Sequence, residues 1–75
     1  MALYDEAVAV AKGYIGPAGQ QFIDRQLTSH LNLKPTDLTA SNLADLAKWC
    51  FASGRLVIDE KQATEFSEKV KSLAI

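Results

Sequence analysis

The sequence predicts an all-α fold: a compact bundle of four helices with short connections, or of five if one of them is short. Hydrophobic residues recur at spacings of three and four along almost the whole chain, and the alternation typical of strands is nearly absent. Glycine and proline interrupt this pattern at only a few places. No repeat, low-complexity stretch or linker divides the 75 residues. We therefore expect a single helical domain over residues 1–75.

The first two predicted helices meet at Gly16 and Pro17. A helix over residues 2–14 presents one apolar face, made of Leu3, Ala7, Val10, Ala11 and Tyr14. Proline cannot continue this helix but suits the first position of the next one, over residues 17–31. Gly16 is then expected to cap the second helix, and Gly19 to allow a close approach of backbones at the corner.

The third predicted helix is the clearest. Pro35 disfavours helix at the preceding residue, so residues 32–36 form a connector. The start of the third helix is open, because three residues that follow Pro35 can each cap a helix: Thr36, Thr39 and Ser41. Its apolar face consists of Leu43, Leu46, Ala47, Cys50 and Phe51. Gly54 is expected to follow the helix as the residue that ends it.

Residues 55–58 connect the third helix to the fourth. They are apolar and partly β-branched, but no second strand candidate exists, so we expect a hydrophobic link pressed onto the bundle. Asp59 opens the fourth helix, with Gln62 three residues later in a capping-box arrangement. The buried face of this helix is predicted to be Ala63, Phe66, Val70, Leu73 and Ala74. Glu65 and Lys69 are spaced to pair along it.

Charge and composition set aside several classes of function. Eight basic and nine acidic residues give a net charge of −1, and both signs are scattered, which argues against a polyanion-binding protein. The longest apolar run, residues 56–58, is far too short to span a membrane. The start of the chain is acidic, unlike a signal peptide. We expect a cytoplasmic protein that has no membrane partner and keeps a free thiol.

The residues that could perform chemistry do not form a recognisable catalytic, cofactor or metal site. Cys50 lies on an apolar helix face, where a thiol more often serves as a small core residue. His30, the one histidine, comes near the end of the second helix, where it suits the helix dipole. The acidic pairs at residues 5–6 and 59–60 occur at helix starts for the same reason. The sequence therefore predicts a protein that is not an enzyme and has no evident small-molecule substrate.

The remaining candidates are contact residues for a protein partner or for self-association. Trp49 lies beside the main face of the third helix, so it either closes the edge of the bundle or stands partly exposed as an anchor. Tyr14 is a second aromatic candidate, and Lys48 and Arg55 could rim the patch. A domain of this size has a thin core. A dimer that buries the Trp49 region would add stability.

Part of the chain resembles a known family. Tyr14-Ile15-Gly16-Pro17-Ala18, followed by Phe22-Ile23-Asp24-Arg25, is similar to a cassette in small helical modules appended to bacterial regulatory proteins, including serine/threonine kinases. Leu43-Ala44-Asp45-Leu46-Ala47 resembles the helix that follows the corner in those modules. The resemblance covers about half of the chain, and the sequence departs from it at Gly19, where the cassette carries a larger residue. It implies a non-catalytic regulatory or assembly role and assigns no functional residue.

Two alternative functions remain open. A nucleic-acid-binding, helix-turn-helix-like pair could use the second and third helices, although the exposed face expected for the third has one cation: Asn42, Asp45, Lys48 and Ser53. The chain is also similar in outline to acyl or peptidyl carrier proteins, which attach their cofactor to a serine in an Asp-Ser-Leu motif. Its nearest match, Ala40-Ser41-Asn42-Leu43, lacks the aspartate.

Overall fold

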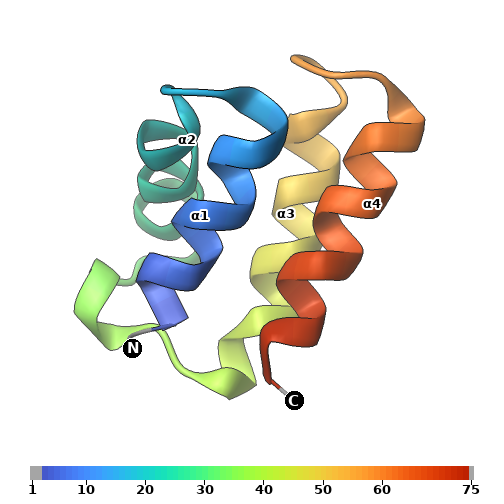
Figure 1. Ribbon diagram of the computed structural model, residues 1–75. Coiled ribbons are helices and arrows are strands. Elements are labelled where there is room, and N and C mark those ends of the chain that lie inside the picture. The colour runs from blue at the N-terminus through green and yellow to red at the C-terminus, as the bar shows by residue number, and fades with distance from the viewer. Residues whose placement is uncertain (1–2, 75) are drawn as a thin grey trace.

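The computed structural model describes residues 3–74, and the side chain of Ala74, predicted to be buried, lies outside the described set. Four α-helices make up most of this part: α1 (Leu3–Ile15), α2 (Gly19–Gln26), α3 (Leu43–Gly54) and α4 (Glu60–Lys71) (Figure 1). Within residues 3–74 there is no strand. The predicted all-α bundle of four helices with short connections is confirmed.

The predicted second helix, residues 17–31, begins two residues later than expected, at Gly19, ends at Leu31 as expected, and changes its winding on the way. A π-helical turn, Leu27–Leu31, directly continues α2. Asn32 then takes a left-handed conformation, with φ of 53°, and the Leu33 amide donates to the Leu27 carbonyl at 2.9 Å. Two 3₁₀ turns, Pro35–Asp37 and Ala40–Asn42, lead from there into α3. Thr39 precedes the second of them, and its amide donates to the Asn42 side chain at 3.1 Å.

The corner between α1 and α2 corrects one prediction and confirms another. Gly16 has a φ of +87° and donates its amide to the Lys12 carbonyl at 3.0 Å, so it ends α1 instead of capping α2. The residue in the cap position of α2 is Ala18. Gly19 does allow close approach: a Cβ built on it would lie 2.6 Å from the Lys12 backbone nitrogen.

The end of α3 also differs from its prediction. Gly54 is not left-handed; it stays within the helix and is buried, and its carbonyl accepts from the amides of Val57 at 2.9 Å and Ile58 at 2.8 Å. These bonds wind residues 55–58 into a tight turn. Successive side chains of a tight turn point in different directions, so Ile58 packs on the core while Leu56 and Val57 face solvent. The prediction of a link pressed onto the bundle is therefore wrong for two of its residues.

Asp59 caps α4 as predicted, but only one of the two hydrogen bonds of the predicted capping box with Gln62 is formed. The Asp59 carboxylate accepts the Gln62 amide at 2.7 Å and so pairs one of the free donors at the helix start. The predicted pairing of Glu65 with Lys69 is not seen among the described residues, and both side chains instead contact Tyr14 on α1. Glu65 accepts a long hydrogen bond of 3.4 Å from the Tyr14 hydroxyl, and the Lys69 ammonium lies 5.2 Å from the centre of the tyrosine ring.

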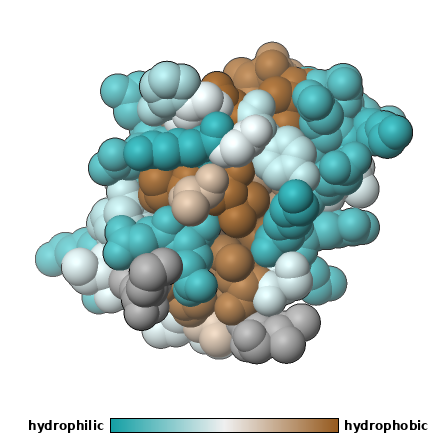
Figure 2. All heavy atoms as spheres, viewed as in Figure 1, coloured by the Kyte–Doolittle hydropathy of each residue, from teal (hydrophilic) through white to brown (hydrophobic). Residues whose placement is uncertain are grey.

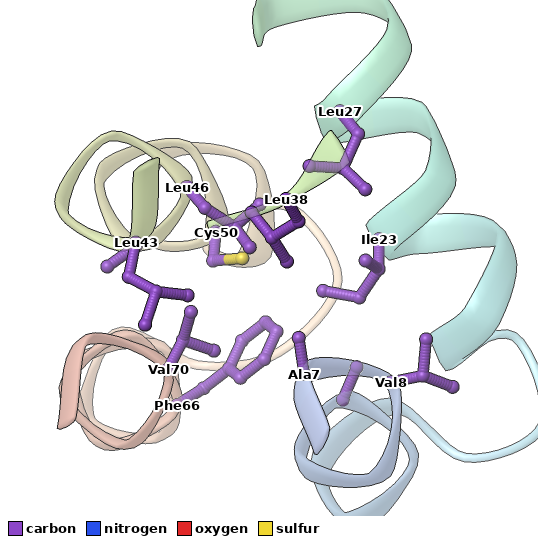
Figure 3. Packing of buried hydrophobic residues seen from close by; sticks show 12 residues of the cluster. Ala7, Val8, Ile23, Leu27, Leu38, Leu43, Leu46, Cys50, Phe66 and Val70 are labelled. Atoms are coloured by element: carbon purple, nitrogen blue, oxygen red, sulfur yellow. The ribbon is translucent and has the colours of Figure 1, made fainter. Parts of the chain in front are cut away.

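One apolar core joins all four helices (Figure 3). Phe66 of α4 is fully buried, and its ring points toward α1 and α2 between the two helix pairs. Leu38, from the connector before α3, closes the core from a segment that the helical pattern did not include. The core consists of Ala7, Val8, Ala11, Ile23, Leu27, Leu38, Leu43, Leu46, Ala47, Cys50, Ala63, Phe66 and Val70.

The helices pack as two antiparallel pairs, α1 with α2 and α3 with α4, and α1 also contacts α4 (Figure 1). The α1–α2 corner and the α3–α4 turn lie at one end of the bundle. The start of α1 and the end of α4 lie at the other end. Among the described residues, none of the helices is long and apolar enough to cross a membrane.

Candidate functional site

A surface groove lies between α2 and the α3–α4 turn, at the end of the bundle where the two connections meet. Its volume is about 330 Å³. We call it the α2 groove, and it is lined by Ile15, Ala18, Gln21, Phe22, Arg25, Gln26, Ser53, Leu56 and Val57. A volume of this order falls at the low end of the range for ligand sites in proteins.

Leu56 and Val57 form the outer lip of the groove. Leu56 is 86% exposed and Val57 is 59% exposed, which makes them the two large hydrophobic residues most open to solvent in the described chain. Figure 2 shows brown surface at the end of the molecule where the α3–α4 turn lies, and a further brown band down the middle of the same face. The turn is held by hydrogen bonds from the Leu56 amide to Ser53 and from the Val57 amide to Gly54. The two exposed aliphatic residues adjoin the apolar wall of the groove, so together they form one contiguous apolar surface, the kind of surface at which proteins bind partners.

The inner wall of the groove is apolar and anchored in the core. Phe22 is half-buried, and its ring centre lies 5.7 Å from that of Phe66. Ile15, the last residue of α1, is also half-buried and packs against the same core. Because both side chains are held by packing, a partner could bury them with little loss of side-chain entropy.

The polar wall of the groove contains the buried side-chain amide of Gln26, whose nitrogen and oxygen are both hydrogen-bonded, and the exposed guanidinium of Arg25, which has no ion-pair partner among residues 3–74. Gln26 is 1% exposed; its amide donates to the Phe22 carbonyl at 3.2 Å and its side-chain oxygen accepts from the Ser53 hydroxyl at 3.0 Å. This bridge fixes α2 against α3 below the groove. Arg25, by contrast, is exposed, and the ion pair found among residues 3–74 is that of Arg55 with Glu60 at 3.8 Å.

Trp49 and Lys48 lie on a different surface. Trp49 is half-buried, and the His30 ring stacks on it at 3.9 Å with an angle of 6° between the planes. The Lys48 ammonium lies 5.9 Å from the centre of the same indole. Trp49 thus covers the edge of the bundle and, with the exposed His30 ring, also presents an aromatic stack to solvent. The stack with His30 is a feature that sequence reasoning missed.

Tyr14 and Arg55 are not part of that surface. The Tyr14 ring packs against Phe66, at 5.7 Å between centres, and is flanked by the polar side chains of α4 described above. Arg55 lies over the Phe51 ring, 5.5 Å from its centre, and pairs with Glu60. Of the four predicted contact residues, the structure therefore brings together only Trp49 and Lys48. Whether any of them meets a partner stays a prediction.

The stack of His30 on Trp49 can be tested by fluorescence, because Trp49 is the one tryptophan in the chain. We expect His30→Ala to shift the emission of Trp49 to longer wavelength, since removal of the stacked ring lets water reach the indole. His30→Phe keeps a flat ring in place and should leave the emission maximum close to that of the wild type. An identical shift in both variants would mean that the stack does not cover Trp49.

Cys50 is a core residue, as predicted. It is fully buried, and burial raises the pKa of its thiol from 9.0 to about 12. The Tyr4 hydroxyl also has a raised pKa, because it donates to the Asp24 carboxylate at 2.6 Å. Among the described residues, no three histidine, cysteine or acidic side chains group closely enough to hold a metal ion. A buried neutral thiol is inert as a nucleophile in the native state.

Burial of Cys50 predicts slow thiol chemistry. We expect an aromatic disulfide reagent to react with native protein only as fast as the fold opens, and much faster in urea. The folded pKa is raised, so the stability that this thiol contributes is present below pH 9 and is lost as pH rises toward about 12. Ala52→Cys in a Cys50→Ala background puts a thiol at an exposed position of α3 and should react at once. Equal native rates in the two proteins would contradict this.

Three side chains weighed for the alternative functions, Ser41, Asn42 and Ser53, are engaged in hydrogen bonds within the fold. Ser41 is exposed in the turn before α3, with its hydroxyl 2.9 Å from that of Thr39. Ser53, expected on an exposed face of α3, is half-buried and bonds to Gln26, so that prediction is wrong. Asn42 is also half-buried and accepts from Thr39. The exposed positions that remain are Asp45 and Lys48, with opposite charges.

The α2 groove was not predicted from the sequence. The sequence feature that points to the groove is the aliphatic run at residues 56–58, but a hydrophobic run is expected to be buried. A helical pattern does not show which side chains of a tight turn point outward, and that direction decides the exposure of Leu56 and Val57.

No protein-family model, curated protein or solved structure matches the chain. The resemblance of residues 14–25 and 43–47 to bacterial signalling modules therefore stays a prediction.

Proposed function

We propose that this chain is a non-catalytic protein–protein interaction module whose partner docks in the α2 groove. The observation that carries the proposal is the pair of exposed aliphatic residues, Leu56 and Val57, next to an apolar wall that is anchored in the core. Burying aliphatic side chains of this size contributes about 1.5–3 kcal/mol each. The resemblance to signalling modules adds a regulatory role in the bacterial cytoplasm to the proposal.

The side chains that could act as nucleophile or base support a non-catalytic role. Cys50 is neutral and enclosed by the core. His30 is stacked on Trp49, away from the residues that line the groove. Within the groove the polar atoms of Gln26 and Ser53 bond to each other, so they serve the fold.

The proposal is tested with a photo-crosslinking amino acid placed at position 56 in cells that make the protein natively. We expect one defined adduct from position 56 and none from exposed position 52 of α3, which does not line the groove. The adduct partner, once purified, should bind the Leu56→Ser/Val57→Ser variant at least about tenfold more weakly.

Ala52→Ser is the matched control and should leave this affinity unchanged. Both variants change exposed residues, so their thermal unfolding midpoints should equal that of the wild type. Adducts that are the same from positions 52 and 56, or full binding by the double variant, would contradict the proposal.

A further inference from the structure

The charge of the α2 groove comes from one residue. Arg25 is exposed on α2 and is the charged side chain among those that line the groove. Its acidic neighbour Asp24 turns away to accept the Tyr4 hydroxyl. The other arginine near this end, Arg55, is held by Glu60. The groove therefore offers one cation with no ion-pair partner in the described chain, beside an apolar wall, and it is complementary to a partner with a carboxylate next to apolar residues.

The backbone around the groove indicates the form of that partner. Its walls are helices and a tight turn whose backbone groups pair internally, as the Phe22 amide does with Ala18 and the Val57 amide with Gly54. No strand occurs in residues 3–74, so the groove has no sheet edge to which an extended peptide could add. An amphipathic helix satisfies its own backbone and presents apolar side chains at i, i+3, i+4 and i+7. A bound amphipathic helix therefore suits this groove, whereas an added strand does not.

A second copy of the chain fits less well. In a symmetric dimer the same surface meets itself, so each α2 groove would face the other. Each groove would contribute Arg25 to the dimer interface, and its lining residues include no carboxylate that could pair with the Arg25 of the other copy. Like charges would then lie close together at an interface, which costs affinity.

We infer that the partner segment is an amphipathic helix carrying an aspartate or glutamate beside its aliphatic residues, and that Arg25 binds this carboxylate. The inference rests on the proposed function, because it names the partner of the same groove. Leu56, Val57 and Phe22 contact the aliphatic side chains, and Arg25 fixes the direction of the helix in the groove.

The experiment selects helical peptides from a phage library with randomised surface positions. Selection uses the wild-type chain, with counter-selection against Leu56→Ser/Val57→Ser so that only groove-dependent peptides remain. We expect the recovered peptides to share aliphatic residues at helical spacing and one acidic position. When such a peptide is added to the isotopically labelled chain, the chemical shifts that change should belong to residues of α2 and the α3–α4 turn.

Charge exchange then tests Arg25 directly. We expect Arg25→Gln to weaken a selected peptide about three- to fivefold, as for a partly exposed ion pair, and Arg25→Glu to weaken it about tenfold or more. Replacing the acidic residue of the peptide by lysine should restore binding to Arg25→Glu but not to the wild type. Lys61→Glu makes the same charge change at an exposed position of α4 outside the groove, and should change affinity less than about twofold.

The outcomes separate the two proposals. Groove-dependent peptides that lack an acidic position and bind Arg25→Gln normally overturn this inference and leave the proposed function standing. If the selected peptides bind in an extended conformation and not as helices, this inference is likewise overturned and the proposed function stands. Recovery of no groove-dependent peptide counts against both. If sedimentation shows that the chain associates with itself and that Leu56→Ser/Val57→Ser abolishes this, the occupant is a second copy and the inference is wrong.

Discussion

Gly19→Ala is expected to destabilise the protein by about 2–3 kcal/mol, the cost of forcing extra volume into a tightly packed contact. The added methyl group would lie 2.6 Å from the Lys12 nitrogen and 2.8 Å from the Ala11 carbonyl carbon, and both are backbone atoms. A backbone contact cannot be relieved by a change of rotamer, so α1 and α2 have to move apart. For a domain of this size the thermal midpoint should fall by about 4–8 °C per kcal/mol.

Gly13→Ala provides the matched control. It makes the same chemical change within α1, and nothing lies within 4 Å of the new methyl group. Alanine favours the helix over glycine, so this variant should gain about 0.5–1 kcal/mol. The two variants are compared by urea and thermal unfolding. Equal effects of the two substitutions would show that α1 and α2 do not approach closely at Gly19.

Phe66→Ala is expected to be the most damaging substitution in the core, with a loss of about 3–5 kcal/mol. The ring is fully buried, and its centre lies 5.7 Å from those of Tyr14 and Phe22, so it joins α4 to α1 and α2. A domain of 75 residues has about 4–11 kcal/mol of stability in total. Phe66→Ala should therefore leave much of the protein unfolded near physiological temperature.

Phe66→Leu keeps the variant folded and measurable, with an expected loss under about 1.5 kcal/mol. Phe51→Ala is the control for ring loss at the edge of the bundle, since Phe51 is half-buried and lies under Arg55. It should cost clearly less than Phe66→Ala in urea unfolding followed by circular dichroism. A similar loss at both positions would mean that Phe66 does not join the two helix pairs.

The helices could be predicted because their signals are local. The apolar face of residues 43–51 and the cap at Asp59 depend on neighbours three or four residues away, and both occur as expected. Close approach at Gly19 was also expected, because a glycine next to a proline corner has few other uses. The role of Gly16 was assigned to the wrong helix, since its left-handed φ depends on how α1 ends.

The candidate site could not be predicted in the same way. The α2 groove joins residues of α1, α2 and the α3–α4 turn, and no pattern within one segment relates them. The burial of Gln26 depends on Ser53, which is 27 residues further along the chain. Trp49 was identified as a candidate from its residue type, but its partner His30 is on another element. Long-range packing decides each of these cases.

The placement of the two chain ends has a practical consequence for how the protein can be attached. Both ends of the described chain lie at the pole of the bundle opposite the α1–α2 corner and the α3–α4 turn (Figure 1). A tether, an affinity tag or a fused protein at either end would therefore leave the α2 groove pointing outward. Molecules immobilised through one end on a sensor surface would present their grooves in a common orientation, accessible to a partner in solution.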